Sequence, residues 1–473
     1  MNLPLVQTVD TAHSPESLVE SLAGLAGLVL LRTGRFDLPS ARYSFVAAEP
    51  FLTFRSVGSR CEVARPGLDR LGPERHFGNP WHLLDALMAR HEMLDEIIHP
   101  FPLGGAFGYW GYDLKNFSEP KLSRRTVDDL ELPDCHVGFH GSLVVFDHWL
   151  GQVFVVSTGL GADGSRTEAR ARAELHRWQA RLETPPTAVS FSSPAVSAAG
   201  QGSRIQYPDP EVFLRAVSRA QKYIRAGDIY QVNLCQRLVA SSSLTGWEWF
   251  KRLSAISPAP YSAYLDCGDF QLASSSPEQF LRLTASQIQT RPIKGTRPRD
   301  TDAACDARLA GELLSSAKEQ AELLMITDLL RNDLGRVCEF GSVRVPEFAR
   351  LEKFAQVQHL VSTVEGRLRP GMTHFHAFAT CFPGGSITGA PKFRAMEIID
   401  ELEPVARGPY TGALGYLGFN RESQLSILIR TVIRRAEQAY FSVGAGIVAD
   451  SQPAAEYEET LAKARGFLAV LEP

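Results

Sequence analysis

The sequence lacks the features that mark several large classes of protein. It has no run approaching the ~18 apolar residues that a membrane-spanning helix needs, and its first residues show no basic region followed by an apolar stretch. We therefore expect neither a membrane anchor nor a signal peptide. It also contains no nucleotide P-loop, no dinucleotide-binding fingerprint and no serine-triad signature, which argues against the enzyme classes built on those motifs.

The chain also has few cysteines and only a small net charge. The seven cysteines are scattered over 473 residues and never spaced as CxxC, a pattern that argues against a disulfide framework or a zinc site and indicates reduced thiols. The net charge of −4 argues against general nucleic-acid binding, which requires a basic surface. We expect a soluble cytoplasmic protein that binds neither nucleic acid nor a membrane.

The length and one low-complexity segment predict how the chain is divided. A single core usually stops growing at roughly 250–300 residues, so 473 residues predict one very large domain or two. Residues 183–207 are dense in Pro, Ser, Ala, Gly and Thr, which is typical of a flexible connection. We place the boundary there, between an N-terminal part, 1–190, and a C-terminal part, 205–473. Hydrophobic periodicity by itself predicts only a strand-rich α/β protein.

Two segments carry more specific structural expectations. Residues 304–336 are predicted to form a long helical region, because apolar residues recur there at helical spacing. Residues 104–113, rich in glycine and aromatic residues, are predicted to form a packed strand pair.

The basic stretch at residues 291–299, Arg-Pro-Ile-Lys-Gly-Thr-Arg-Pro-Arg, is the first candidate for chemistry. Its prolines restrict φ and Gly295 permits a turn or a close approach, so Lys294 is positioned by the backbone around it. Four cationic side chains without an acid should attract an anionic ligand, and a partly desolvated lysine can act as a nucleophile. The alternative is a basic surface loop between two strands.

Two pairs of glutamates form the second candidate. Glu319 and Glu322 are three residues apart, as are Glu456 and Glu459, and Lys463 follows four residues after Glu459. On helices, each pair lies on one face. The two pairs could meet across Mg²⁺, which accepts carboxylate ligands; the alternative is two solvated helix faces.

Glycine-rich segments form a third group of candidates. Residues 382–392 precede a predicted helix start, where backbone amides favour an anion. Residues 443–447, Val-Gly-Ala-Gly-Ile, would let a carboxylate reach the main chain.

Three single residues complete the candidates. Arg430 lies in an apolar strand pattern and needs either a bidentate carboxylate ligand or an internal salt bridge. His359 is either a core histidine or a hydrogen-bonding group for a substrate hydroxyl. Glu278 is either an acid at a strand start or a catalytic acid.

Taken together, these stretches resemble the chorismate-utilising enzymes, which include anthranilate, aminodeoxychorismate, isochorismate and salicylate synthases. The matching stretches follow the family's order and span nearly all of the chain after the predicted connection. Residues 43–50 and 101–112 also resemble the N-terminal part of the amino-transferring branch. The resemblance implies a large α/β fold with two face-packed β-sheets and helices outside.

Two positions distinguish the branches of the family. Anthranilate synthases resemble this chain but carry alanine where Lys294 stands, whereas aminodeoxychorismate synthases carry lysine. The water-adding branch carries a lysine base at the position aligned with Gln231. The resemblance therefore implies an aminating enzyme that makes 4-amino-4-deoxychorismate from chorismate and ammonia, for p-aminobenzoate and folate synthesis. The alternative is anthranilate synthase component I.

The resemblance also implies a role for each candidate residue. Lys294 would attack the ring, and Glu278 would transfer protons. Mg²⁺, held by Glu319, Glu322, Glu456 and Glu459, would bind the ring carboxylate. The implied substrate-binding residues are Gly295, Thr296, His359, Ser386, Tyr410, Arg430, Gly444, Gly446 and Lys463.

Two partners are implied as well. No cysteine lies in a glutaminase-like context, so ammonia would come from a separate glutamine amidotransferase subunit in a heterodimer. Family members have a tryptophan pocket near segments matching residues 30–34, 41–45 and 258–262. Regulated members carry Leu-Leu-Glu-Ser where this chain has Leu-Leu-Arg-Thr at 30–33. We therefore expect at most a structural tryptophan, with weak or absent feedback inhibition.

Overall fold

Two large antiparallel sheets form the centre of the protein. The computed structural model describes residues 3–33, 41–69, 72–94, 99–186, 205–354 and 357–471. The first sheet contains, in spatial order, β1 (Leu5–Val9), β10 (Gln152–Ser157), β9 (Ser142–Asp147), β3 (Tyr43–Ala47), β2 (Val29–Arg32), β13 (Tyr261–Asp266), β14 (Gln271–Ser276), β23 (Thr431–Arg435), β24 (Gln438–Ile447), β12 (Gln231–Ser241) and β11 (Ile205–Gln206), with β20 (Gly389–Ala390) also paired to β12.

The second sheet is of similar size. It contains β17 (Ile293–Pro298), β19 (Val357–Arg367), β16 (Gln287–Arg291), β15 (Gln279–Thr284), β22 (Glu422–Ile427), β21 (Ala413–Gly418), β7 (Gly105–Trp110), β8 (Cys135–His140), β4 (Leu52–Val57), β5 (Arg60–Ala64) and β6 (Glu74–Phe77), with β18 (Arg344–Lys353) paired to β19.

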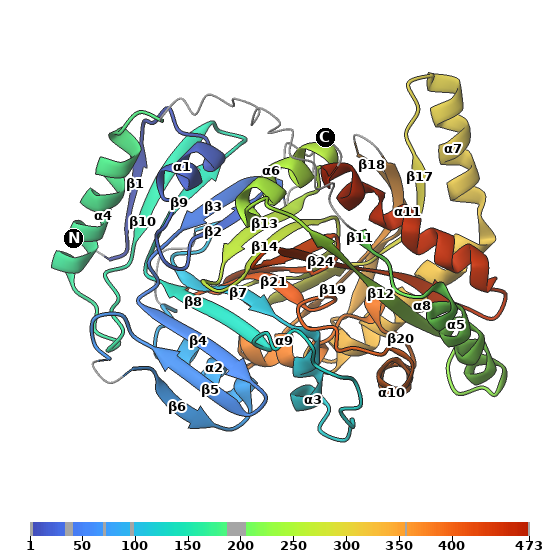
Figure 1. Ribbon diagram of the computed structural model, residues 1–473. Coiled ribbons are helices and arrows are strands. Elements are labelled where there is room, and N and C mark those ends of the chain that lie inside the picture. The colour runs from blue at the N-terminus through green and yellow to red at the C-terminus, as the bar shows by residue number, and fades with distance from the viewer. Residues whose placement is uncertain are drawn as a thin grey trace.

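Helices surround the sheets (Figure 1). They are α1 (Pro15–Ser21), α2 (Pro80–Ala89), α3 (Lys115–Ser118), α4 (Glu168–Glu183), α5 (Pro210–Arg225), α6 (Gly246–Ile256), α7 (Ala303–Ser315), α8 (Ala317–Gly335), α9 (His374–Cys381), α10 (Lys392–Leu402) and α11 (Pro453–Leu471), with short 3-10 turns η2 (Tyr112–Leu114) and η3 (Gly385–Ile387). Within the described residues, none of these helices is long and apolar enough to cross a bilayer.

The sheets pack face to face, as the sequence predicted. Phe45 of the first sheet and Tyr416 of the second place their ring centroids 5.1 Å apart, edge to face. A second core lies between the first sheet and the helices α1, α4, α6 and α11, where Trp178 and Trp249 are almost fully buried. The predicted fold, two packed sheets with helices outside, is therefore confirmed.

The parts of the chain before and after the predicted connection share both sheets. In the first sheet β2 pairs with β13, and in the second β7 pairs with β21, with Tyr109 opposite Leu414. Most of the predicted connection, residues 187–204, lies outside the described residues. The division into 1–190 and 205–473 stays a prediction.

The helical region predicted at residues 304–336 is confirmed, and it consists of two helices, because Ser316 adopts an extended conformation and caps α8 by accepting the Glu319 N–H. One local prediction was wrong. Residues 104–113 form one strand, β7, followed by η2, and the partners of β7 come from distant segments. The basic stretch is not a loop, since β17 pairs along β19.

Candidate functional site

A cavity of about 520 Å³ lies between the two sheets' edges and the helices α8 and α11. All of the candidate residues from the sequence line it, although no observation tests their individual roles. They are Glu278, Lys294, Gly295, Thr296, Glu319, Glu322, His359, Ser386, Tyr410, Arg430, Gly444, Gly446, Glu456, Glu459 and Lys463.

Lys294 enters the cavity from β17. A bulge between Lys294 and Thr296 interrupts the pairing with β19, and Gly295 at the bulge has φ +69°, a conformation that L side chains rarely adopt. The Lys294 Nζ lies 3.9 Å from the position that a Cβ on Gly446 would occupy. The amine therefore reaches from the second sheet to β24 of the first.

Glu278, which follows β14, is a buried acid close to this amine. Burial raises its pKa, while a hydrogen bond with the Ser386 side chain and the charge of Lys294 oppose the shift. Desolvation thus favours the protonated carboxyl, which suits a group that gives a proton and takes it back.

His359, on β19, is buried beside the bulge. Its Nδ1 lies 2.8 Å from the Thr296 hydroxyl, and burial lowers its pKa to about 4. The imidazole is therefore neutral near pH 7. The structure shows a buried histidine that also lines the cavity, and its role toward a substrate hydroxyl stays a prediction.

Arg430 lies after β22 with φ +51° and is half-buried. Burial lowers its pKa, and among the described residues no neighbouring carboxylate offsets the shift. The internal salt bridge that the sequence left open is therefore not found in the described part of the chain. A desolvated guanidinium without a counter-ion favours an anionic ligand.

Tyr410 faces the main chain of β24. Its hydroxyl lies 3.0 Å from the position that a Cβ on Gly444 would occupy, and the Asn233 Nδ2 lies 3.1 Å from the same point. A side chain at 444 would collide with both groups. The glycine therefore keeps this wall of the cavity open at the level of the backbone.

The four glutamates approach the cavity from two helices, Glu319 and Glu322 from α8 and Glu456 and Glu459 from α11. Burial raises the pKa of Glu322, and the charges of Glu319 and Glu459 raise it further. The positive charges of Lys294 and Lys318 act in the opposite direction and lower it. Burial likewise raises the pKa of Glu456, with Glu459 adding to it and Ser451 opposing it. The carboxylate oxygens are donors of the kind that a hard divalent cation prefers.

These glutamates are not gathered around one point. Glu319 pairs with Arg297 at 3.4 Å and Glu459 with Lys463 at 2.7 Å, and Lys463 also donates to the Gly444 carbonyl at 2.8 Å. Within the described residues, no three His, Cys, Asp or Glu side chains are arranged to hold a metal. The donor chemistry fits Mg²⁺, and the side chains would have to converge to bind it.

Sequence reasoning missed some lining residues and misplaced one feature. Asn233 on β12 and Ser442 on β24 both line the cavity; each is a polar residue within an apolar strand, which is the signal that could have revealed them. In the glycine-rich loop, Ser386 and Ile387 line the cavity, and no residue from the start of α10 does so. The predicted anion site at that helix start is therefore not part of this cavity.

Comparisons with known proteins agree with this site. The model of the family described as chorismate binding enzyme matches residues 44–469. Anthranilate synthase component 1 of Acetivibrio thermocellus is 39% identical, covering 91% of this chain and 87% of that protein. Aminodeoxychorismate synthase component 1 of Klebsiella aerogenes is 44% identical, covering 94% and 93%.

A solved structure extends the agreement to the fold. Anthranilate synthase component I from Streptococcus pneumoniae superposes with a TM-score of 0.77 at 31% identity, over 93% of this chain and 94% of that one. The chain belongs to the chorismate binding enzymes.

Proposed function

We propose that this protein is component I of aminodeoxychorismate synthase, which converts chorismate and ammonia to 4-amino-4-deoxychorismate for p-aminobenzoate and folate synthesis. The observation that carries the proposal is Lys294, whose amine lies in the cavity where the anthranilate synthases of the family have alanine. Gln231 supports the same branch, because the water-adding enzymes have a lysine base there. The overall sequence identity to relatives does not distinguish aminodeoxychorismate synthase from anthranilate synthase, because relatives of both names are similarly identical to this chain.

The proposed chemistry uses Lys294 as a covalent nucleophile. Its amine adds at C2 of the ring, both conjugated ring double bonds shift by one position toward C4, and the 4-hydroxyl leaves as water with a proton from Glu278. Ammonia then adds at C4, both double bonds shift back, and the bond from C2 to the lysine nitrogen breaks. Glu278 takes up the proton that ammonia loses, so the enzyme returns to its initial state.

The two carboxylates of chorismate would bind at opposite ends of the cavity. Arg430 and Tyr410, with Ser386 and His359 nearby, would hold the enolpyruvyl carboxylate. The ring carboxylate would lie against the main chain of Gly444 and Gly446 near Lys463. Mg²⁺ held by Glu319, Glu322, Glu456 and Glu459 would neutralise this second carboxylate and polarise the allylic system when bound.

Ammonia would come from a separate glutamine amidotransferase subunit. All seven cysteines are free, and Cys61, Cys135, Cys267, Cys338 and Cys381 are buried; burial raises the pKa of these thiols, which disfavours the nucleophilic thiolate. We also place the protein in the cytoplasm, where thiols stay reduced. The purified chain should use ammonium salts and fail to use glutamine.

The test is an incubation with chorismate, Mg²⁺ and ammonium, followed by product identification by mass. The aminodeoxychorismate product keeps the enolpyruvyl group, and the reaction releases no pyruvate. The second candidate, anthranilate synthase, is favoured by relatives of that name at 39–43% identity. It would release pyruvate and form fluorescent anthranilate. Either anthranilate as the main product or turnover with glutamine alone would contradict the proposal.

A further inference from the structure

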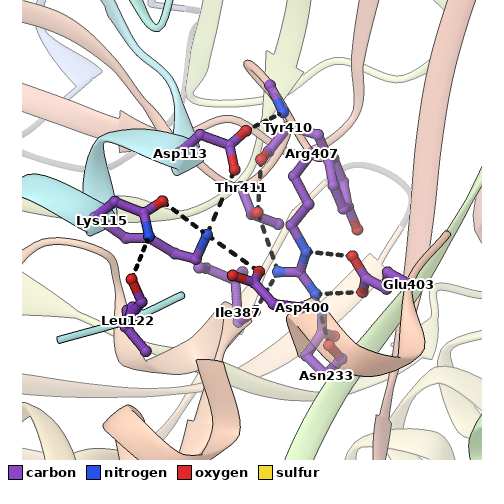
Figure 2. Close-up of polar contacts among 12 residues, drawn as sticks. Asp113, Lys115, Leu122, Asn233, Ile387, Asp400, Glu403, Arg407, Tyr410 and Thr411 are labelled. Atoms are coloured by element: carbon purple, nitrogen blue, oxygen red, sulfur yellow. Dashed lines mark hydrogen bonds and ion pairs between the residues drawn. The ribbon is translucent and has the colours of Figure 1, made fainter. Parts of the chain in front are cut away.

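A buried arginine lies directly behind the cavity, in the turn that follows α10. Arg407 is 5% exposed, and it pairs with Glu403 through two hydrogen bonds, of 2.7 Å from Nη2 and 2.9 Å from Nε. Its guanidinium also lies over the ring of Tyr112, 4.6 Å from the centroid. Figure 2 shows this arginine between Glu403, Thr411 and Asn233.

The remaining hydrogen bonds of Arg407 go to three segments that form walls of the cavity. Nη2 donates to the carbonyl of Asn233 on β12 at 2.7 Å, and Nη1 donates to the carbonyl of Ile387 in η3 at 3.0 Å. Nη1 also donates to the Thr411 hydroxyl at 3.2 Å, next to Tyr410. Asn233, Ile387 and Tyr410 line the cavity, whereas Arg407 itself does not.

We propose that Arg407 is a positioning residue that fixes Asn233, η3 and the Tyr410 turn relative to one another, so that the enolpyruvyl end of the substrate meets one preformed wall. Asn233 and Ile387 are 154 positions apart in the sequence, and the Arg407 side chain bonds to both of them and to Thr411. The proposal rests on chorismate being the substrate, as proposed above.

The chemistry of arginine suits this task. Its guanidinium is planar and presents donors at fixed angles, so bonds to several acceptors constrain their relative positions. A lysine would keep the charge that Glu403 requires but would lose the fixed fork. Glu403 also accepts the backbone N–H of Cys235 at 2.9 Å, which ties the same ion pair to β12 a second time.

Lys115 provides a matched control in the same network (Figure 2). It is 1% exposed and pairs with Asp400 at 3.1 Å and Asp113 at 3.4 Å. Neither acid lines the cavity. Removing this lysine should therefore disturb a buried ion pair without moving the cavity wall.

The test compares Arg407→Lys with Lys115→Met in steady-state kinetics, chorismate binding by calorimetry and thermal melting. We expect Arg407→Lys to lower kcat/KM by about 10- to 100-fold, mainly through a higher KM, as a displacement on the order of 1 Å does elsewhere. Lys115→Met should lower the melting temperature and leave KM within about twofold of the wild type. A wild-type KM for Arg407→Lys in folded protein would overturn the proposal.

Two further variants keep the test decisive. If Arg407→Lys does not fold, Thr411→Val, which removes only one of its bonds, should raise KM by a smaller factor. In the Tyr410→Phe background, Arg407→Lys should raise KM less than it does alone, because both changes act on one wall; fully multiplicative effects would contradict the proposal. Absence of chorismate binding by the wild type would instead count against the proposed function.

Discussion

The Oε2 atom of Glu319 lies 3.1 Å from the position that a Cβ atom on Gly295 would occupy. The bulge that presents Lys294 is thus packed against a glutamate of α8, and Leu313 of α7 closes the same space at 2.7 Å. The strand that carries Lys294 and helix α8 can approach this closely because residue 295 has no side chain.

The first prediction follows from this contact. Gly295→Ala should displace Lys294 or Glu319, because the added methyl group meets Leu313 and the left-handed conformation costs about 1–2 kcal/mol. Turnover should fall by more than about tenfold as the amine moves off its position. Gly24→Ala is the control, since Gly24 has φ +88° with no atom within 4 Å of the added Cβ. It should lose similar stability and keep its activity; equal activity of the two variants would contradict the packing argument.

The second prediction concerns the nucleophile. Lys294→Ala should reduce amination by at least about 10³-fold, because no other group can form the covalent intermediate. Chorismate binding in the presence of Mg²⁺, measured by calorimetry, should stay nearly intact, because the proposed binding groups lie elsewhere. The variant carries the alanine of the lyase branch, and we expect at most trace anthranilate as a side product. Turnover at the wild-type rate would reduce Lys294 to an electrostatic role.

The third prediction concerns Arg430. Arg430→Gln should raise the dissociation constant of chorismate by about 10- to 100-fold, the amount expected for losing a hydrogen-bonded charge partner. The variant should not lose stability, because the wild-type guanidinium is desolvated and no carboxylate in the described part of the chain lies beside it. Arg434→Gln serves as the control: Arg434 donates to the Leu244 carbonyl and does not line the cavity. Unchanged chorismate affinity of Arg430→Gln would rule out Arg430 as a carboxylate ligand.

The fourth prediction concerns tryptophan. The cavity bounded by Leu31, Arg32, Phe45, Tyr261 and Ser262 has a volume of about 30 Å³, roughly that of one water molecule in the liquid. Arg32 is paired with Glu16; residue 34 of the predicted pocket lies outside the described residues. An indole would therefore enter only after these walls move apart. We expect micromolar tryptophan to leave turnover unchanged, and strong inhibition would show the prediction to be wrong.

The fifth prediction concerns acid stability. His374 is buried, with Nε2 donating to the Ala285 carbonyl at 2.9 Å and Nδ1 lying 2.9 Å from the Ser423 hydroxyl. Burial lowers its pKa to about 4. The unfolded state takes up a proton near pH 6.5 and the folded state only near pH 4, so the stabilisation is present above 6.5 and is lost as pH falls.

Urea unfolding at several pH values tests this sign. Between pH 6.5 and 4, the wild type should lose stability relative to His374→Gln, at up to about 1.4 kcal/mol per pH unit. Above pH 7 the difference between the two proteins should be constant. A difference that does not change with pH would show that His374 titrates alike in both states.

Local chemistry determined much of this protein in advance. The glutamate pairs at 319/322 and 456/459 each lie on one face of a helix, because residues three positions apart in an α-helix project to the same side. Ser14 caps α1 through its own side chain and adjacent backbone groups, so this helix start needs no distant partner. The family pattern supplied the two packed sheets, which periodicity alone could not specify.

Tertiary structure decided which groups meet and which stay unpaired. Lys294 lies near Gly446, 152 positions along the chain, only because β17 of the second sheet approaches β24 of the first. Among the described residues no carboxylate lies beside Arg430, and Arg407 bonds to three separate segments. Both facts depend on side-chain burial and long-range pairing, which no local spacing encodes. The sequence indicated the candidate groups, and packing determined their distances, their charge partners and their access to water.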